Sequence, residues 1–457
     1  MKNYDIIVVG GGPGGAMAAK VASEKGLKAV FFERGRKSGE KNSSGCGLGP
    51  RLWRDFPDMM KRLTPDVAPS MRPGSAARNY FINKDDVVVG MVMARPTESV
   101  KYEPAKSWIT MNCYRSDFDP WIANLAIEAG AEQITSTLVV KLIKENGKVI
   151  GVQTESGEKY KAPIIIGADG ALSMVAQQAG LRHKWNLSQI TVVPQYDFYV
   201  PKENINNIMG DETLGVWWGS TFPAAYQVFF GEGMHLGLGN WLHWWDKNPL
   251  YYLNRVVNLP YFQRLMKILD AKPREVQSHL LPWATYPENT FTDNVMLIGD
   301  AGGFPCPLEA EGIYPAVVTG NIAAEVAAKA ISDGDTSKAA LQAYEDGWKK
   351  SSVGIEFDAG PELQHIWSKL PFEPKTMEWF VPMIMEILGG IYDWSEPHAV
   401  RVRNIIEHVR GYLPKAIPFI MQEVIPLLSK ILQDDFKNIT NLAEMIPKLI
   451  PKKKRGK

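Results

Sequence analysis

The chain has 457 residues, of which 45% are hydrophobic, and a formal net charge of +1 at pH 7. This length accommodates two or three packed domains, and the near-neutral charge without a basic stripe through the body excludes nucleic acid as a main partner. Three cysteines, Cys46, Cys113 and Cys306, are too few and too far apart for a disulfide framework or an iron–sulfur cluster, so any such cluster would sit on another chain.

A dinucleotide-binding unit is predicted at the start of the chain. Residues 4–33 read YDIIVVGGGPGGAMAAKVASEKGLKAVFFE, an apolar strand, a glycine turn, a helix of small residues and a second strand that ends on an acid. Gly10, Gly12 and Gly15 let the backbone turn tightly, approach a pyrophosphate and pack the helix on the sheet. The helix N-terminus then faces the phosphates, and Glu33 accepts hydrogen bonds from a ribose.

Further helix and strand patterns follow along the chain. Residues 114–130, YRSDFDPWIANLAIEAG, place an arginine before an acid and a proline typical of a helix start, followed by an apolar face at helical spacing. Residues 131–169 read as short strands with an Asn146-Gly147 hairpin turn, and they close on a buried strand at Ile164–Ile166. The turn GADGALS comes next, at residues 167–173. Taken alone, these patterns also fit a surface helix and an ordinary strand end.

The second half of the chain divides into a sheet region and a helical region. Residues 190–282 carry strand-like segments rich in Trp, Tyr and Phe, and Val295–Ile298 form an apolar strand followed by the turn GDAGG and a helix. Beyond Asp335 the pattern is helical, with prolines that separate short helices. We therefore expect an α/β fold with a discontinuous Rossmann-type domain at 1–185 and 283–335, an inserted antiparallel-sheet substrate domain at 186–282 and a helical C-terminal region at 336–457.

Found in this order, the motifs resemble the FAD-dependent oxidoreductase superfamily that contains geranylgeranyl reductases and FixC-type electron-transfer flavoprotein:quinone oxidoreductases. The resemblance covers about residues 4–330 and implies FAD as the cofactor. It implies that Arg115 lies near the adenosine diphosphate, that Asp300 lies along the ribityl chain and pyrophosphate, and that Asp169 supports the turn over the cofactor. The cofactor-binding residues that the resemblance implies are Gly10, Gly12, Pro13, Gly14, Gly15, Glu33, Arg34, Gly45, Cys46, Gly47, Arg115, Val139, Ala168, Asp169, Gly170, Gly299, Asp300, Gly312 and Ile313.

Within this superfamily, two stretches favour the FixC side. GEKNSSGCGLGPR, at 39–51, resembles the loop that covers the flavin in the quinone oxidoreductases, and RSDFDPWIANLAIEAGA, at 115–131, is close to their second motif. The Cys46-Gly47 pair, however, also matches the Cys-Gly of prenyl reductases. The YxWxFP-type substrate signature of those reductases is only partly echoed by VWWGSTFPAAY at 216–226.

The leading hypothesis is therefore an enzyme that takes electrons from an electron-transfer flavoprotein or a ferredoxin-like partner and passes them to a quinone. The first alternative is a reductase that saturates isolated double bonds of a prenyl chain. The second alternative is a non-enzymatic relay subunit whose flavin only passes electrons within a complex. Because the flavin carries the redox chemistry in each case, no catalytic triad is expected.

Several side chains are candidates for the chemistry beyond the cofactor site. Cys46 is either a proton donor or redox-active thiol near the flavin, or a packed bystander. Four aromatic residues either line a tunnel for a quinone or prenyl chain or belong to the core: Trp217, Trp218, Phe222 and Tyr226. The histidines show no HxH or HExxH spacing, so we assign no metal and expect structural roles for His235, His243 and His279.

The C-terminal segment combines an apolar face with a basic end. Residues 412–457 join YLPKAIPFIMQEVIPLLSKILQ to the terminal KKKRGK. Such a segment either lies on an anionic membrane surface or caps the protein's own core. The first strand begins at about Tyr4 without room for a signal peptide, and no uncharged apolar run reaches the roughly 20 residues that span a bilayer. We therefore expect a cytoplasmic protein, either free or peripheral on the inner face of the membrane.

Overall fold

The computed structural model describes residues 2–40, 45–83, 87–94, 110–358, 360–370, 372–391 and 395–427. The chain divides into two compact units. Unit 1 contains residues 1–79, 91–217 and 224–361, and unit 2 contains residues 80–90, 218–223 and 362–457. Unit 2 therefore combines two short internal segments with the C-terminal helices. The three-part division expected from the sequence stays a prediction.

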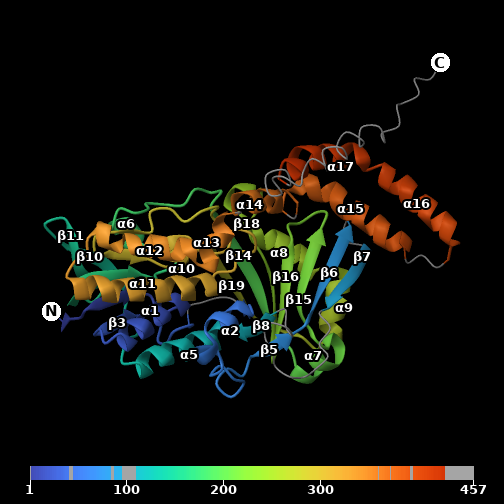
Figure 1. The fold of residues 1–457 in the computed structure, drawn as a ribbon. Helices are drawn as coiled ribbons and strands as arrows, with labels where there is room; N and C mark the ends of the chain where they lie inside the picture. Colours follow the sequence, from blue (N-terminus) through green and yellow to red (C-terminus); the bar gives the residue numbers. More distant parts are fainter. Residues whose placement is uncertain are drawn as a thin grey trace. The chain divides into compact units, whose positions relative to one another are not determined.

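Unit 1 contains a six-stranded sheet with the order β20-β21-β13-β2-β3-β9. Its strands are β20 (Phe291–Thr292), β21 (Val295–Leu297), β13 (Ile164–Gly167), β2 (Ile6–Val9), β3 (Ala29–Phe32) and β9 (Glu132–Ile134). Figure 1 labels strand β3 of this sheet. All neighbours are parallel except β20 and β21. Every residue of β2, β3, β13 and β21 is buried, as expected of apolar strands covered on both faces. The strands predicted at Ile164–Ile166 and Val295–Ile298 are thus confirmed as β13 and β21.

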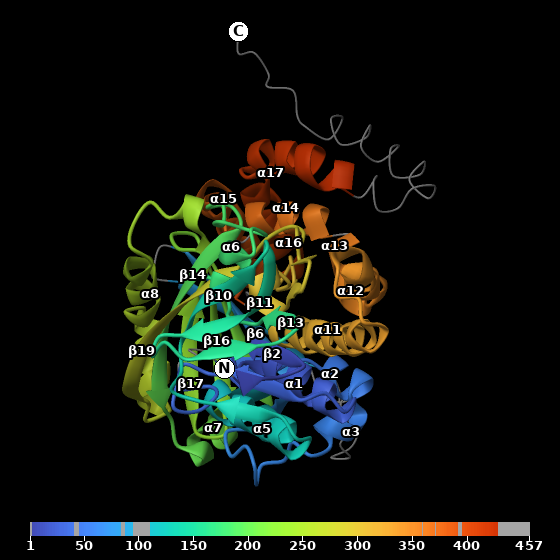
Figure 2. The same ribbon diagram turned by 90° about the vertical axis from the view of Figure 1, so that its left-hand side faces the viewer.

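Helix α1 (Pro13–Glu24) packs against both α11 (Ile313–Asp333) and α5 (Arg115–Glu128), as Figure 2 shows. The approach of α1 to α11 is close because glycines lie at the contact. A Cβ on Gly320 would lie 2.4 Å from the Gly14 oxygen, and a Cβ on Gly14 would lie 2.9 Å from the Ala316 oxygen. This contact fixes the position of the α1 N-terminus.

The start of α5 differs from the prediction. The acid and proline pattern predicted that the helix begins at Asp119-Pro120, but it begins at Arg115 and contains Pro120. Pro120 is the sixth residue of α5, beyond the first turn, so its missing N–H removes the bond to the Ser116 carbonyl. The side chains of Arg115 and Asp119, four residues apart, pair across this early turn.

A four-stranded sheet with the order β1-β12-β11-β10 also belongs to unit 1. Its strands are β1 (Lys2–Asn3), β12 (Lys159–Lys161), β11 (Lys148–Thr154) and β10 (Val139–Glu145), and α6 (Met174–Gln178) packs against β10. The predicted hairpin is confirmed, because Asn146 and Gly147 join β10 to β11 with φ angles of 50° and 80°. Asn and Gly tolerate this left-handed backbone better than other residues.

The strand-rich region predicted at 190–282 forms most of an eight-stranded sheet. The order is β18-β14-β17-β16-β15-β6-β7, and β19 pairs with β14. Its strands are β18 (Asn240–Trp241), β14 (Ile190–Tyr199), β17 (Gly233–Leu238), β16 (Ala225–Phe230), β15 (Glu212–Gly219), β6 (Ala76–Asn83), β7 (Val87–Ala94) and β19 (Lys272–Pro282). Helices α7 (Lys202–Met209), α8 (Pro249–Val257) and α9 (Pro260–Ile268) lie between these strands in sequence.

A small sheet with the order β4-β8-β5 completes the strands of unit 1. It consists of β4 (Gly45–Leu48), β8 (Thr110–Tyr114) and β5 (Arg72–Gly74), and α2 (Arg51–Asp55) and α3 (Pro57–Met60) follow β4. Residues 41–44, part of the loop predicted to cover the flavin, lie outside the described residues.

The helical pattern predicted beyond Asp335 is confirmed within the described residues. The helices are α12 (Lys338–Lys350), α13 (Ser352–Asp358), α14 (Gly360–Lys369), α15 (Pro374–Ile391), α16 (His398–Arg410) and α17 (Leu413–Phe419), followed by a π-helical turn at Ile420–Val424. In unit 2, Phe81, Met377, Val381 and Met385 form a buried apolar cluster against which Trp218 packs. No helix in the described ranges is both long enough and apolar enough to cross a bilayer.

Candidate functional site

The glycine turn after β2 is tightly packed on one side and open on the other. A Cβ on Gly10 would lie 2.1 Å from the Ala168 oxygen, and a Cβ on Gly15 would lie 1.9 Å from the Gly10 oxygen, so neither position accepts a side chain. Among the residues that the structure describes, only Arg115 Nη2 would lie within 4 Å of a Cβ on Gly12, at 3.8 Å. The space beside Gly12 at the positive end of α1 is therefore available to a ligand, and an anionic group is favoured there.

Arg115 is held in place by its own helix. Its Nε and Nη2 donate to the two carboxylate oxygens of Asp119 at 2.5 and 2.6 Å, and Asp119 is fully buried. Such a bidentate pair fixes the plane of the guanidinium group, here beside Gly12. The sequence analysis did not assign Asp119, although an acid four residues after the arginine on a helix is a recognisable signal.

Asp300 and Gly312, far apart in sequence, are neighbours. Asp300 lies in α10 (Gly299–Gly302) after β21, and a Cβ on Gly312, just before Ile313 at the start of α11, would lie 3.3 Å from Asp300 Oδ1. Burial raises the pKa of Asp300 to about 6, although the positive charge of Arg115 opposes this rise. Within the described part of the chain no group donates a hydrogen bond to this carboxylate, so it is available to the hydroxyl groups of a ligand.

Glu33 lies at the end of β3 and is 9% exposed. The Gly35 N–H donates to Glu33 Oε1 at 2.7 Å, and the Gly11 N–H also bonds this carboxylate. Burial raises the pKa of Glu33, and these backbone bonds partly oppose the rise. Two further predicted residues differ in burial: Arg34 is exposed, and Val139 is buried at the start of β10.

Asp169 supports the turn behind Gly10. Its carboxylate accepts hydrogen bonds from the Ser173 hydroxyl at 2.5 Å and from the Val175 N–H at 3.1 Å, at the start of α6. Burial raises the pKa of Asp169, and these hydrogen bonds oppose the rise. The turn of residues 168–170 is thereby fixed against the glycine turn.

Gly45, Cys46 and Gly47 lie on β4, where the backbone of Cys46 pairs opposite Cys113 of β8. The Cys46 side chain is outside the described residues, so the role proposed for its thiol stays a prediction. Burial raises the pKa of Cys113 to about 12, which makes this second thiol unreactive.

The four aromatic residues proposed for the substrate fall in both units. Trp217 is fully buried in unit 1, and its indole N–H donates to Gln227 Oε1 at 3.0 Å. Tyr226 also belongs to unit 1, whereas Trp218 and Phe222 belong to unit 2. Because Trp217 and Trp218 are successive residues of β15, their side chains point to opposite faces of the sheet.

The three histidines considered above lie in different surroundings. His235 Nε2 lies 3.1 Å from the buried Asp197 Oδ1, which also accepts a hydrogen bond from the Tyr114 hydroxyl at 3.1 Å. Burial lowers the pKa of His279, and His243 lies on a 3₁₀ turn. Among the residues that the structure describes, no group of three or more His, Cys, Asp or Glu side chains could hold a metal ion.

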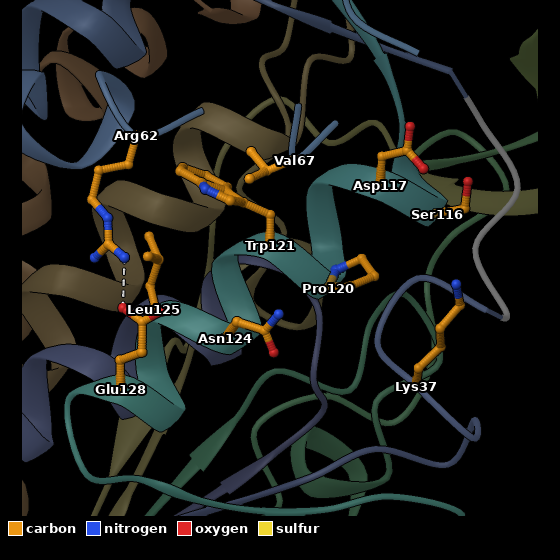
Figure 3. Close-up of a pocket in the computed structure, with 10 residues that line it drawn as sticks. All are labelled: Lys37, Arg62, Val67, Ser116, Asp117, Pro120, Trp121, Asn124, Leu125 and Glu128. Atoms are coloured by element: carbon orange, nitrogen blue, oxygen red, sulfur yellow. Dashed lines mark hydrogen bonds and ion pairs between the residues drawn. The ribbon is translucent and has the colours of Figure 1, made fainter. Parts of the chain in front are cut away.

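A pocket of about 270 Å³ runs along one face of α5 (Figure 3). An ion pair between Arg62 and Glu128, with a nitrogen–oxygen distance of 2.6 Å, lies at one end. The pocket contains none of the residues predicted for the cofactor or the substrate, so it takes no part in the assignment.

The sequence analysis missed an ionic cluster next to Gly312. Arg51 pairs with Glu311 at 2.5 Å and with Glu356, and its guanidinium lies 4.4 Å from the centre of the Tyr314 ring. Burial raises the pKa of Glu311, although Arg51 opposes this rise. These residues come from α2, from the α11 region and from α13, so no local spacing in the sequence points to the cluster.

The residues around the glycine turn fit an FAD molecule. The open space beside Gly12 suits a pyrophosphate, and the Arg115 guanidinium next to it suits the negative charge. The carboxylates of Glu33 and Asp300 can accept hydrogen bonds from ribose and ribityl hydroxyls.

Comparison with known proteins agrees with this geometry. The family described as FAD binding domain matches residues 3–350. The chain is 30% identical over 369 residues to the digeranylgeranylglycerophospholipid reductase of Methanosphaerula palustris, a match that covers 79% of this chain and 85% of that protein. It is 32% identical over 376 residues to the protein of the same name from Methanothrix thermoacetophila, with 80% and 88% covered.

Two solved structures share the fold. One is a geranylgeranyl bacteriochlorophyll reductase-like protein from Thermoplasma acidophilum, with a TM-score of 0.70, 23% identity, and 92% of this chain and 99% of that chain covered. The other is a variant of the halogenase PltM in complex with FAD, with a TM-score of 0.58, 13% identity, and 90% and 96% covered.

The matched family and the similar structures confirm the predicted fold class, a Rossmann-type FAD-binding domain with an inserted antiparallel sheet and a helical C-terminal region, and they confirm FAD as the cofactor. They do not support the leading hypothesis of electron transfer to a quinone, and they favour the prenyl reductase alternative. The chain belongs to the FAD binding domain family, within the geranylgeranyl reductase superfamily, and is an FAD-dependent oxidoreductase.

Proposed function

We propose that this protein is a reductase that saturates double bonds in the prenyl chains of a lipid. The observation that carries this proposal is the 30% and 32% identity, over 79% and 80% of the chain, to two proteins named digeranylgeranylglycerophospholipid reductase. A lipid substrate also fits the apolar candidates for contact with the substrate.

In this proposal FAD lies beside Gly12, between the side chains of Arg115, Glu33 and Asp300. The α1 N-terminus and Arg115 hold the pyrophosphate, because both present positive charge at the open space beside Gly12. Glu33 accepts hydrogen bonds from the ribose, and Asp300 accepts them from the ribityl chain. The backbone of Gly312, next to Asp300, then lies at the flavin end of the site.

Saturation of a carbon–carbon double bond adds a hydride to one carbon and a proton to the other. FAD, when bound and reduced, supplies the hydride. The protein must therefore hold a proton beside the substrate and keep bulk water away from the reacting carbons. Cys46, on the loop predicted to cover the flavin, is the candidate proton donor.

Trp217, Trp218, Phe222 and Tyr226 stay individual candidates for contact with the substrate, and they are not assigned to one wall because Trp217 and Trp218 point to opposite faces of β15. A prenyl chain has no polar atoms, so it requires an apolar and aromatic lining. Trp217 is fully buried and hydrogen-bonded to Gln227, so it acts from within the core.

Product analysis tests the proposal. The FAD-loaded protein, reduced with dithionite in the absence of oxygen, is incubated with a geranylgeranyl phospholipid, and the extracted lipid is analysed by mass spectrometry. We expect a gain of two hydrogen atoms for each double bond saturated. A Gly12→Asp variant, in which a carboxylate fills the pyrophosphate space, should give no product, whereas Gly389→Ala should behave as the wild type because nothing lies near its added methyl group. Unchanged lipid from fully reduced protein would contradict the proposal.

A further inference from the structure

One side of helix α16 is anchored within unit 2. Helices α15 and α16 pack against each other (Figure 1). His408 Nδ1 lies 3.0 Å from Glu386 Oε2 on α15, and the buried Arg401 donates through Nη1 to the Ile391 carbonyl at 2.8 Å. The side of α16 that carries Arg401 and His408 therefore faces α15.

Another side of α16 exposes apolar side chains next to basic ones. Val402 is 56% exposed and Ile406 is 53% exposed. Residues three and four positions away are neighbours on a helix surface, so Ile406 lies beside Val402 and Val409 and also beside Arg403 and Arg410. Both arginines are exposed. We call these five residues the Ile406 face.

We propose that the Ile406 face docks on an anionic lipid surface. An apolar stripe flanked by cations on a short surface helix is the pattern that inserts into the headgroup region, where the apolar side chains enter the acyl boundary and the arginines meet lipid phosphates. The 13 residues of α16 give a helix that lies flat on a bilayer rather than one that spans it.

The positive charge of the C-terminal sequence favours lipid over a protein partner. Lys415 is exposed soon after α16, and the last ten residues, 448–457, carry six basic residues and no acid. Glu407, the one acid of α16, lies beside Arg403 and Arg410 at spacings of four and three residues, and the two arginines outnumber it, so this side of the helix keeps a net positive charge.

This proposal places a membrane contact outside residues 412–457, the segment for which the sequence left a membrane surface and the protein's own core as alternatives. Within the described part of residues 412–457, Ala416 is buried, the Phe419 ring packs edge-to-face on Trp379 of α15 at 5.8 Å, and Glu423 lies 2.5 Å from His365 of α14. These contacts direct α17 and the turn after it toward other helices of unit 2. Val402 and Ile406 of α16, at 56% and 53%, are more exposed than Ile420 in the turn after α17, at 38%.

Vesicle binding by the full-length, FAD-loaded protein tests the proposal. Vesicles of dioleoyl phosphatidylcholine, with and without dioleoyl phosphatidylglycerol, contain no prenyl chain, so binding is independent of the proposed reductase activity. We expect the wild type to cosediment with the anionic vesicles. The pair Val402→Gln and Ile406→Gln should weaken this binding at least tenfold. The pair Arg403→Gln and Arg410→Gln should weaken it more than tenfold at low salt and less at high salt.

Matched variants serve as controls. Ile355 is 64% exposed on α13 in unit 1, and Arg264 is exposed on α9, so Ile355→Gln and Arg264→Gln remove the same kinds of side chain elsewhere. Both should bind vesicles as the wild type does. Circular dichroism and the flavin absorbance establish that each variant is folded. The proposal is overturned if the wild type ignores anionic vesicles, if the Val402 and Ile406 variant still binds them, or if that variant instead dissociates a dimer in sedimentation velocity.

Discussion

Gly12 caps helix α1 and Gly15 is in its first turn, but only Gly12 has space for a side chain. The Gly15 Cα hydrogen points at the Gly10 oxygen, where a Cβ would approach to 1.9 Å, so Gly15→Val should prevent the turn from forming. Gly12→Asp has room in the protein alone but places a carboxylate where the pyrophosphate lies. We expect Gly12→Asp to be folded and colourless and Gly15→Val to be largely unfolded, as measured by circular dichroism and by flavin absorbance after gel filtration. A Gly12→Asp protein that retains stoichiometric FAD would contradict the assignment.

Asp300 should make the stability of the flavin-free protein depend on pH. Its carboxyl ionises near 3.8 in an unfolded chain but at about 6 in the folded protein. Between these values the folded state binds the proton more tightly, so the free energy of unfolding falls as the pH rises through this window and is level above it. Asp300→Asn should remove this slope and stabilise the flavin-free protein at neutral pH by roughly 1–3 kcal/mol.

Urea unfolding of both flavin-free proteins at a series of pH values measures this effect. The informative quantity is the difference in the free energy of unfolding between Asp300→Asn and the wild type at each pH, because the other titrating groups are present in both proteins. A difference that stays constant across the window would show that Asp300 does not ionise as described. The same variant should also bind FAD more weakly, since an amide is a weaker acceptor for the ribityl hydroxyls than a carboxylate.

At the scale of elements, the contact between α1 and α11 depends on Gly320. A methyl group at this position would lie 2.4 Å from the Gly14 oxygen, so Gly320→Ala must separate the two helices. We expect a loss of about 2 kcal/mol in the free energy of unfolding and weaker FAD binding, because the α1 N-terminus moves. Asn321→Ala, at the next residue of α11, is the matched control and should leave both quantities near the wild-type values.

The Arg51 cluster links α2, α11 and α13. We expect substitutions within it to have non-additive effects on the free energy of unfolding. Replacing Arg51 with methionine leaves the carboxylates of Glu311 and Glu356 close together without their cation, which should cost roughly 1–3 kcal/mol because the side chains are only partly buried. Adding Glu311→Gln to Arg51→Met should recover part of that loss. Equal stability of the single and double variants in urea unfolding would show that the residues are not coupled.

Elements specified by local sequence were predictable. The strand–turn–helix unit at 4–33, the Asn146-Gly147 hairpin and the C-terminal helices follow from periodicity and from residues suited to particular backbone angles. The start of α5 was misplaced because proline is tolerated at more than one early helix position. The recruitment of β6 and β7 into the eight-stranded sheet was missed, because side-chain alternation identifies a strand but not its partners.

At the scale of the whole molecule, every residue implied for FAD lies in unit 1. A chain that ends at Pro361 should therefore still bind FAD. It should also aggregate, because Phe81 and Trp218 lose the apolar cluster that they form with Met377 and its neighbours in unit 2. Adding Phe81→Ser and Trp218→Ser should restore solubility. Light scattering and the flavin absorbance measure the two effects, and a soluble truncated chain without FAD would contradict this division of roles.

The cofactor site was more predictable than the substrate site for a physical reason. Phosphate binding restricts the three glycines in different ways: Gly10 has a φ of 113°, Gly15 has no room beside the Gly10 oxygen, and Gly12 leaves space for the phosphate. A prenyl chain requires only an apolar surface, and many core residues also provide one. The sequence around Trp217 therefore does not distinguish a residue that lines a tunnel from one that fills the core. The Arg51 cluster had no sequence signal because its members meet only in the folded chain.

Anaerobic stopped-flow reoxidation of the reduced protein tests the central claim most directly. Reduced protein is mixed in turn with a geranylgeranyl phospholipid, with its fully saturated counterpart and with a menaquinone analogue, while the flavin absorbance is followed. Our account predicts reoxidation by the unsaturated lipid and none by the saturated one, since only the first can accept a hydride and a proton. Reoxidation by the quinone alone would contradict it and would restore electron transfer to a quinone as the function.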